Sequence, residues 1–434
     1  MLLSNSLAFL LAEADDDVDP GFAGYPLAFE RLVRTAFRRP IQTIPTARGK
    51  SVQLIEMVNV LTKFDGTLTI LQKPPDPPFH DFESYVASLR HSIGAVASNA
   101  ADEERLTRYE MVQGISSGYD SAASAVLTST EGCRRAVTFR SSRIRPGTPT
   151  TIDDGDRVAT RLGMQIRGFD RNSYLTRSDH PEAEFLATGM SGEDVVVTAF
   201  EPMLARAVYC TGYLGGDVWG LDKDGSFDRL NETLDGCSLG EFRLRVDFVH
   251  LPVPTIAYRA LRVIDGISRS VEMAPYSVGG WYDRPIPRRL LEEAGLERGT
   301  FATAKRAVNA LVHSQPEKAL SAATRAELRA FAEGSAGRPT AQVAFALAHL
   351  RQRIQILLSR VVHRVGLQSR LPSWIGMPYP IHDHSRAGSL RFQWAISKIK
   401  SRYSPAGIIS TEVLPPTGTP TATTDQVSTS SARE

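Results

Sequence analysis

The sequence predicts an α/β protein: a doubly wound, Rossmann-like parallel sheet followed by a mainly helical C-terminal region. Three observations predict it. Apolar strand-like segments alternate with helical ones between residues 107 and 215, two of these segments end in glycine-containing loops, and residues 340–402 carry apolar side chains at helical spacing. Alternating strands and helices are typical of a parallel sheet with helices on both faces. Ligands of such sheets bind beyond the carboxyl ends of the strands.

Residues 1–78 are mixed in character. The opening stretch MLLSNSLAFLLA lacks the basic start of a signal peptide and precedes a run of aspartates, so we expect a short apolar element there. Val52–Ile55 and Thr67–Gln72 are expected strands on either side of a turn at Phe64–Gly66. A cluster of prolines before residue 79 then predicts a stiff boundary.

Residues 79–240 are expected to form the domain that contains the parallel sheet. Its elements, in order, are expected to be helix Phe82–Ala97, strand Tyr109–Gly114, helix Ala122–Leu127, strand Arg135–Phe139, a helical turn at Arg157–Gly163, strand Met164–Arg167, helix Asp194–Ala205 and strand Ala207–Thr211. Residues 241–403 would complete this domain with helices. Residues 404–434 are rich in Ser, Thr and Pro, which predicts a disordered tail.

Composition indicates an ordinary globular protein. The formal net charge is +2, with 42% hydrophobic and 23% charged residues, so the overall charge identifies no partner. Its three cysteines are far apart and form no C-x-x-C pair, which argues against structural zinc and fits a reducing, cytoplasmic compartment. No apolar run predicts a membrane span. The basic stretch 351–402 is interpreted as a solvated face balanced by acids elsewhere, rather than as a nucleic-acid surface.

A serine- and glycine-containing loop, Ser116–Ser121, lies between an expected strand and a helix of small residues. Unpaired N–H groups at a helix N-terminus attract phosphate. Gly118 lets the backbone approach a ligand closely, and the serine hydroxyls add donors. Asp120 makes sense in such a loop as a ligand of Mg²⁺ that bridges phosphate oxygens. The alternative is an ordinary strand–helix turn with a serine N-cap.

A second glycine-containing loop, Thr211–Gly220, directly follows the expected strand Ala207–Thr211 and contains Asp217. The carboxyl ends of neighbouring parallel strands lie side by side. Asp120 and Asp217 are therefore expected to converge on one metal ion. The alternative for Asp217 is a helix N-cap.

These two loops carry a resemblance to a known family. SSGYDS resembles the S-G-G-x-D-S signature of the N-type ATP pyrophosphatases, the PP-loop superfamily of adenine nucleotide α hydrolase-like proteins. TGYLGGDVWG is similar to the second acidic loop, G-x-G-x-D-E, of the asparagine synthetase type. The resemblance covers roughly residues 80–310. It implies that ATP is cleaved between its α and β phosphates, that AMP is transferred to a substrate carboxylate or similar oxygen, and that an amine or ammonia then displaces AMP.

The resemblance also implies roles for single residues. Pyrophosphate would be held by Ser116, Ser117, Gly118, Asp120 and Ser121. Mg²⁺ would be held by Asp120 and Asp217, and Gly216 would lie beside the nucleotide. Thr138 and Phe139 would lie near the adenine. Lys305 would contact the adenylated intermediate, although a solvated helix lysine is an equal alternative.

The sequence departs from the family pattern at three positions. Ser117 replaces the first motif glycine, Leu2 stands where a glutamine amidotransferase has its cysteine, and Val218 replaces the acid after Asp217. The expected function is therefore an asparagine synthetase-like, ATP-dependent ligase without its own glutaminase domain. The alternative is a catalytically degenerate nucleotide-binding or scaffold protein. The stretch Tyr282–Arg298 is similar to a segment of uncharacterised asparagine synthetase-like proteins and names no substrate.

Overall fold

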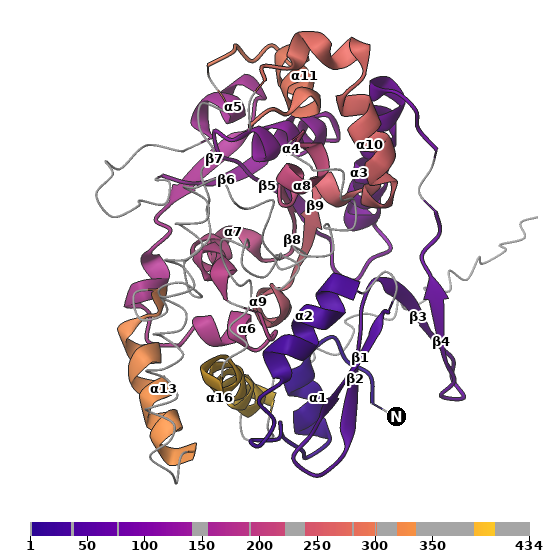
Figure 1. Ribbon diagram of the computed structural model, residues 1–434. Helices are drawn as coiled ribbons and strands as arrows, with labels where there is room; N and C mark the ends of the chain where they lie inside the picture. Colours follow the sequence, from indigo (N-terminus) through magenta and orange to yellow (C-terminus); the bar gives the residue numbers. More distant parts are fainter. Residues whose placement is uncertain are drawn as a thin grey trace, which may run out of the picture.

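A parallel sheet forms the centre of the protein. The computed structural model describes residues 2–35, 39–75, 78–140, 155–190, 192–221, 239–279, 282–299, 301, 319–335 and 386–403 (Figure 1). In these residues the sheet has five strands in the order β7-β6-β5-β8-β9, and each neighbouring pair is parallel. The strands are β5 (Glu110–Gly114), β6 (Arg135–Phe139), β7 (Gln165–Phe169), β8 (Ala207–Thr211) and β9 (Phe248–Pro252). The chain enters the sheet at its central strand, β5, and adds β6 and β7 on one side. It then returns to add β8 and β9 on the other side of β5. This order confirms the predicted α/β class.

The sequences of two helices that pack near the sheet explain where each helix begins and how closely it can approach the strands. Helix α3 (Phe82–Ala101) begins with a capping box, in which Asp81 accepts from the Ser84 N–H and the Ser84 hydroxyl accepts in return. Helix α4 (Tyr119–Thr130) buries a run of small residues that lets it lie close to β5 and β8. Both helices include the predicted segments, Phe82–Ala97 from its apolar spacing and Ala122–Leu127 from its small apolar residues, and each extends beyond them.

The other elements surround this centre. The helices are α1 (Leu7–Glu13), α2 (Tyr25–Thr35), α5 (Asp156–Arg161), α6 (Glu182–Leu186), α7 (Glu201–Leu204), α8 (Gly215–Trp219), α9 (Gly240–Val246), α10 (Leu261–Ser268), α11 (Pro285–Glu293), α13 (Ala322–Ser335) and α16 (Arg386–Tyr403). The expected helix Asp194–Ala205 is instead a 3₁₀ segment, Glu193–Phe200, followed by the short helix α7. None of the helices in the described residues is both long and apolar enough to cross a lipid bilayer.

Two antiparallel strand pairs precede α3. Strand β1 (Ile41–Pro45) pairs with β2 (Ser51–Ile55), and β3 (Val58–Thr62) pairs with β4 (Leu68–Gln72). The sequence predicted strands at 52–55 and 67–72, where β2 and β4 lie, but it placed them on either side of one turn. This pairing is wrong because each strand belongs to a different pair. The reason is a second turn, where Gly49 adopts φ +73° between β1 and β2, in addition to the predicted turn, where Gly66 adopts φ +82°.

Segments from both ends of the sequence share one hydrophobic core below the sheet. Helix α16 contacts α1, α2 and α6 (Figure 1). Ala8 and Tyr25, which are fully buried, belong to the same core cluster as Val112 of β5 and Trp394 of α16. Burial of these side chains therefore depends on residues near the start, middle and end of the chain.

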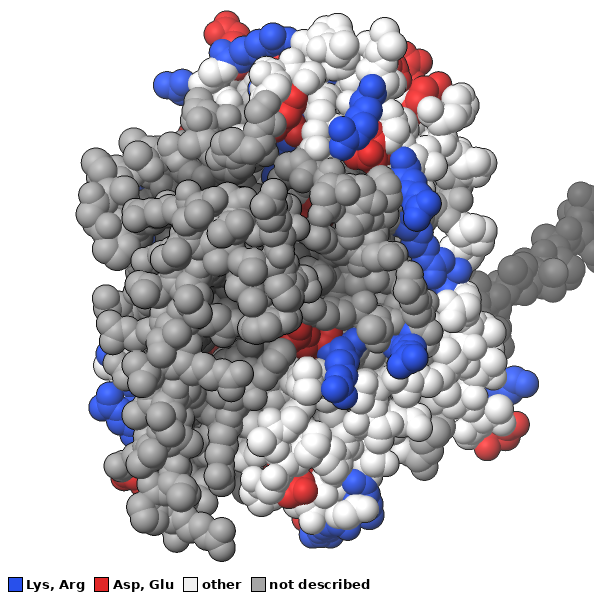
Figure 2. All heavy atoms as spheres, viewed as in Figure 1, with Lys and Arg blue, Asp and Glu red and all other residues white. Residues whose placement is uncertain are grey.

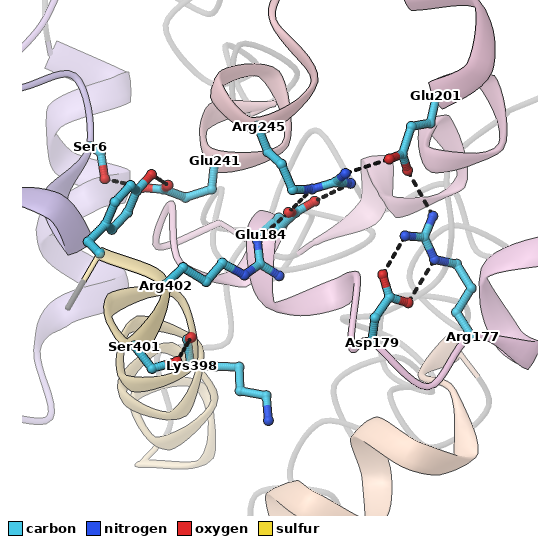
Figure 3. A network of polar contacts seen from close by, with 11 residues as sticks. Ser6, Arg177, Asp179, Glu184, Glu201, Glu241, Arg245, Lys398, Ser401 and Arg402 are labelled. Atoms are coloured by element: carbon cyan, nitrogen blue, oxygen red, sulfur yellow. Dashed lines mark hydrogen bonds and ion pairs between the residues drawn. The ribbon is translucent and has the colours of Figure 1, made fainter. Parts of the chain in front are cut away.

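A buried glutamate joins the helices that surround this core (Figure 3). The Glu184 side chain is 1% exposed and accepts from Nε of Arg245 at 2.5 Å, from Nη2 of Arg245 at 3.2 Å, and from Arg402. Arg245 also pairs with Glu201, which in turn accepts from Arg177 at 2.9 Å. The ion pairs thus connect α6, α7, α9 and α16.

A second buried carboxylate lies beside this one. Glu241 of α9 accepts from the Ser6 hydroxyl at 2.5 Å and from the Tyr403 hydroxyl at 2.8 Å (Figure 3). Burial raises the pKa of Glu241 above its ordinary value. Its two bonds hold the N-terminal cap of α1 and the last residue of α16 against the same helix.

The basic stretch 351–402 is described only from residue 386 onward, in α16. There Lys398 pairs with Glu327 at 2.6 Å and Lys400 with Asp17 at 2.9 Å. These pairs agree with the interpretation of a basic face balanced by acids of the fold. On the face shown in Figure 2, other Lys and Arg side chains gather along the side where α10 lies, with acidic ones nearby.

Several predictions fall on other parts of the chain. Lys305, the helical segment from 340 to 385 and the predicted disordered tail 404–434 lie outside the described residues.

Candidate functional site

The loop Ser116–Ser121 lies at the reversal point of the sheet. It follows β5, and the neighbouring strand on the other side of the reversal is β8. The chain leaves β5 toward β6 in one direction, and β8 continues toward β9 in the other. The loops after β5 and β8 therefore stand where doubly wound sheets bind their ligands.

The serine hydroxyls of this loop bond to the loop itself. The Ser121 hydroxyl accepts from the Ser116 N–H at 3.0 Å and lies 2.8 Å from the Ser116 hydroxyl. The Ser116 hydroxyl also accepts from the Gly118 N–H at 3.2 Å. The N-cap residue of α4 is Gly118, which has no side chain to cap the helix, so the alternative of a serine N-cap is wrong. The first turn of α4 thus presents its N–H groups at the end of a loop that its own hydroxyls hold in shape.

The loop after β8 packs directly on the first turn of α4, and two glycines allow it. A Cβ atom added at Gly212 would lie 2.3 Å from the carbonyl carbon of Asp120 and from the Ser121 nitrogen. A Cβ atom at Gly215 would lie 2.5 Å from Cβ of Asp120. Between these glycines, Leu214 adopts the left-handed φ of +62°. The two loops that the sequence selected are therefore in contact.

Asp120 of the first loop pairs with a buried arginine from a distant segment. Its Oδ2 accepts from Nη1 of Arg284, whose side chain is 4% exposed, whereas that of Asp120 is 24% exposed. Arg284 is the N-cap residue of α11, and its guanidinium lies 4.9 Å from the centre of the Tyr282 ring. The negative charge of Asp120 is therefore balanced by a cation that belongs to the chain.

A second arginine of α11 lies one helical turn further on. Arg288 is 8% exposed and donates from Nη2 to the hydroxyl of Tyr119, the residue before Asp120. Its guanidinium lies 5.2 Å from the centre of the same ring, and Nη1 lies 3.6 Å from Glu292. Burial lowers the pKa of Arg288. Among the described residues its Nε–H has no acceptor.

Arg289, the next residue, contacts α3 and nearby acidic residues instead of α4. Its guanidinium lies 3.9 Å from the centre of the Phe82 ring and pairs with Glu272 at 2.9 Å and Glu293 at 2.7 Å. These contacts attach α11 to α3. Arg289 therefore supports the position of α11, while Arg284 and Arg288 contact the first turn of α4.

The predicted Mg²⁺ ligands come from the two contacting loops. Asp217 is the third residue of α8, and its side chain is exposed. The N-cap residue of α8 is Leu214, so the alternative of Asp217 as a helix N-cap is wrong. Mg²⁺ at phosphate sites commonly takes one or two carboxylates, with phosphate oxygens and water as its other ligands, so the donor set of Asp120 and Asp217 fits this ion. The described residues hold no cluster of three or more His, Cys, Asp or Glu side chains.

Three further predicted site residues belong to the described part of the chain and lie on α8 and β6. Gly216 is the second residue of α8. Thr138 is 1% exposed, and its hydroxyl accepts from the Gly155 N–H at 3.2 Å. Phe139 is 7% exposed and stacks on Phe200, with ring centres 4.3 Å apart. Both side chains are engaged in packing at the carboxyl end of β6.

Sequence reasoning named Arg284, Arg288 and Arg289 within the stretch Tyr282–Arg298 but did not predict that Arg284 pairs with Asp120. It missed a polar pair on β8 and β9. The Thr211 hydroxyl lies 2.8 Å from Nε2 of His250. The His250 ring also stacks on Tyr209, with ring centres 5.7 Å apart. A histidine inside an otherwise apolar stretch, FVHLP, was the signal that could have identified this residue.

No protein-family model matches the chain, and no curated protein matches it either. The chemistry open to the site therefore follows from its own residues. These are a loop with serine and glycine in contact with a second loop that contains glycines, one carboxylate from each loop, and two buried arginines beside α4.

Proposed function

We propose that this chain is an ATP-dependent, AMP-forming ligase of the asparagine synthetase type. It would adenylate a substrate carboxylate with release of pyrophosphate and then form an amide with an amine or ammonia. The observation that supports this proposal is the contact between the loop Ser116–Ser121 and the loop 212–215 at the reversal point of the sheet. This contact puts an uncapped helix N-terminus and two carboxylate-bearing loops at one place.

Each group in this proposal has a physical role. The N–H groups in the first turn of α4 would bind the β and γ phosphates, because they lie at the positive end of that helix. Ser116, Ser117, Gly118 and Ser121 would form the loop around the phosphates, with the Ser116 and Ser121 hydroxyls turning from each other toward the ligand. Held by Asp120 and Asp217, Mg²⁺ would neutralise the charge that develops on the leaving pyrophosphate. Gly216 would lie beside the nucleotide.

The adenine side of the site rests on β6. Thr138 and Phe139 would form the wall beside the base, where their packing against Gly155 and Phe200 keeps that wall rigid. Lys305 is proposed to contact the adenylated intermediate.

Release of pyrophosphate tests this proposal. The full chain would be incubated with ATP, Mg²⁺ and a panel of carboxylates and amines, with AMP and pyrophosphate measured together. We expect Asp120→Ala to lower turnover by a factor of about 100 or more, as loss of a charge-stabilising group typically does. Glu103→Ala is the matched control, since this carboxylate is 90% exposed on another surface. Turnover by Asp120→Ala at the wild-type rate would contradict the assignment.

A second function is favoured by the ion pair between Asp120 and Arg284. An arginine that pairs with Asp120, the predicted metal ligand, occupies the carboxylate that catalysis would need for Mg²⁺. This arrangement favours a protein that binds nucleotide without cleaving it. Isothermal titration with ATP, with and without Mg²⁺, separates the two functions when AMP is assayed in the same samples. Binding without AMP formation across the whole panel would favour the scaffold, and turnover with any substrate would exclude it.

A further inference from the structure

The ion pair between Arg284 and Asp120 is a buried contact inside the candidate phosphate loop. Arg284 is 4% exposed, so its guanidinium needs an anionic partner to offset the loss of water. Asp120, at 24% exposed, keeps access to solvent. A carboxylate that binds both an arginine and a divalent cation would hold two positive groups within a few ångströms of each other, where they repel. Arg284 and Mg²⁺ therefore compete for Asp120.

The segment that carries Arg284 borders the loop itself. The Tyr282 hydroxyl is 4.0 Å from the position that a Cβ atom would take on Gly118, the N-cap residue of α4. The guanidinium of Arg284 lies over the ring of Tyr282. A polyphosphate bound at the loop would thus offer oxygens to the same guanidinium, and arginine binds phosphate oxygens in the same forked manner as carboxylates.

We propose that Arg284 is an exchangeable cation of this site. It neutralises Asp120 while the loop is without a ligand, and it changes its partner to a polyphosphate oxygen when Mg²⁺ takes its place on Asp120. The inference rests on the proposed function in that a polyphosphate binds at Ser116–Ser121, but it requires no cleavage of ATP. It assigns Arg284 a role in ligand binding as a specificity residue for phosphate.

Arg288 is the fixed member of the arginine pair. It is bonded to the Tyr119 hydroxyl and is more than nine-tenths buried. Its Nε–H has no acceptor among the described residues. A positive charge therefore stays beside the first turn of α4 whichever partner Arg284 has, which favours an anion there.

Titration calorimetry with inorganic pyrophosphate tests the exchange on the full chain, with Mg²⁺ and in its absence. We expect Arg284→Gln to weaken binding with Mg²⁺ about 10- to 100-fold, the effect of one charge-assisted hydrogen bond. We expect Asp120→Asn to tighten binding without Mg²⁺ about tenfold, because it releases Arg284. Arg90→Gln, an exposed arginine on α3, is the control for the change in net charge and should bind as wild type does.

The double variant Asp120→Asn/Arg284→Gln separates exchange from simple repulsion. If Asp120→Asn tightens binding only because a negative charge is gone, the double variant keeps the gain. If the gain comes from the released Arg284, the double variant loses it. Retention of the gain, wild-type affinity of Arg284→Gln, or no tightening in Asp120→Asn would each overturn the inference. If wild type binds no pyrophosphate in either condition, the inference is also overturned.

The experiments distinguish an error in the proposed exchange of Arg284 partners from an error in the proposed ligase activity. If no substrate supports AMP formation while the pyrophosphate titrations follow the expected pattern, the ligase fails and the exchange stands. If AMP forms and Arg284→Gln binds pyrophosphate as wild type does, the ligase stands and the exchange fails. Should Arg284→Gln not fold, as judged by circular dichroism, Arg284→Lys replaces it in the single and the double variant, because lysine keeps the charge but lacks the forked donors of arginine. Wild-type pyrophosphate affinity of Arg284→Lys, or a double variant that keeps the gain of Asp120→Asn, would then overturn the inference.

Discussion

Replacing Gly212 by alanine should move the two loops of the site apart and weaken nucleotide binding strongly in a protein that still folds. The new Cβ atom would lie 2.3 Å from backbone atoms of Asp120 and Ser121, whereas such atoms almost never come within 3.0 Å of another heavy atom. The two backbones must therefore move apart by about 0.7 Å, and by about 1 Å to reach an ordinary contact near 3.4 Å. No side-chain rotation can relieve this clash, because both partners are main chain.

A displacement of this size should lower the stability of the fold only slightly but weaken ligand binding at the site strongly. Overpacking by one methyl group typically costs about 1–3 kcal/mol of stability. A misplacement of about 1 Å in a site can cost roughly 100-fold in function. We therefore expect Gly212→Ala to melt only a few degrees lower and to bind Mg²⁺·ATP about 100-fold more weakly.

Titration calorimetry with Mg²⁺·ATP and a thermal melt measure the two effects. Gly266→Ala is the matched control, because a Cβ atom on this glycine of α10 meets no atom within 4 Å. It should bind ATP normally and be slightly more stable, since alanine is the better helix former. Wild-type ATP affinity in Gly212→Ala would refute the idea that the contact between these loops forms the nucleotide site.

Two further predictions concern the buried carboxylates that join the helices. Burial raises the pKa of Glu241 above 4.5, so its contribution to stability is present below pH 4.5 and is lost as the pH rises through the raised value. The melting temperature of Glu241→Gln minus that of wild type should therefore increase from pH 4.5 to pH 7, and a difference that does not change with pH would contradict this reasoning. Glu184→Ala should lower the free energy of unfolding in urea by about 3 kcal/mol, because it leaves Arg245 and Arg402 without their shared partner. The exposed control Glu103→Ala should change it by less than about 0.5 kcal/mol, and an equally small effect of Glu184→Ala would be inconsistent with a stabilising role.

The sequence predicted the three inner strands closely, and it predicted β7 at 164–167, shifted by one to two residues from its observed bounds, but it missed β9. Strands β6 and β8 begin and end at the predicted residues, since each is a short, largely apolar segment in which four of the five residues are buried. Strand β9 was missed because it is an edge strand in which only Phe248 is fully buried, and it contains a histidine and ends in proline. Its pairing with β8 supplies the strand character that its sequence lacks.

The candidate site was predictable in part for a similar reason. The loops after neighbouring parallel strands lie side by side, so the contact followed once β5 and β8 were taken to be neighbours, as the strand order has them. The partner of Asp120 was not predictable, because Arg284 lies 164 residues further along the chain. No local pattern distinguishes it from its neighbours Arg288 and Arg289, which the fold directs to other partners.

The packing of α16 on α1 has a consequence for synthesis of the protein. Lys400 donates to the backbone of Asp16, which is 384 residues earlier in the chain. At ordinary translation rates the ribosome needs roughly 20 to 80 s to cover that distance. During this interval the apolar side chains Ala8 and Leu11 of α1 have been made, but the helix that covers them has not. The native packing of α1 is therefore completed only after α16 has been synthesised.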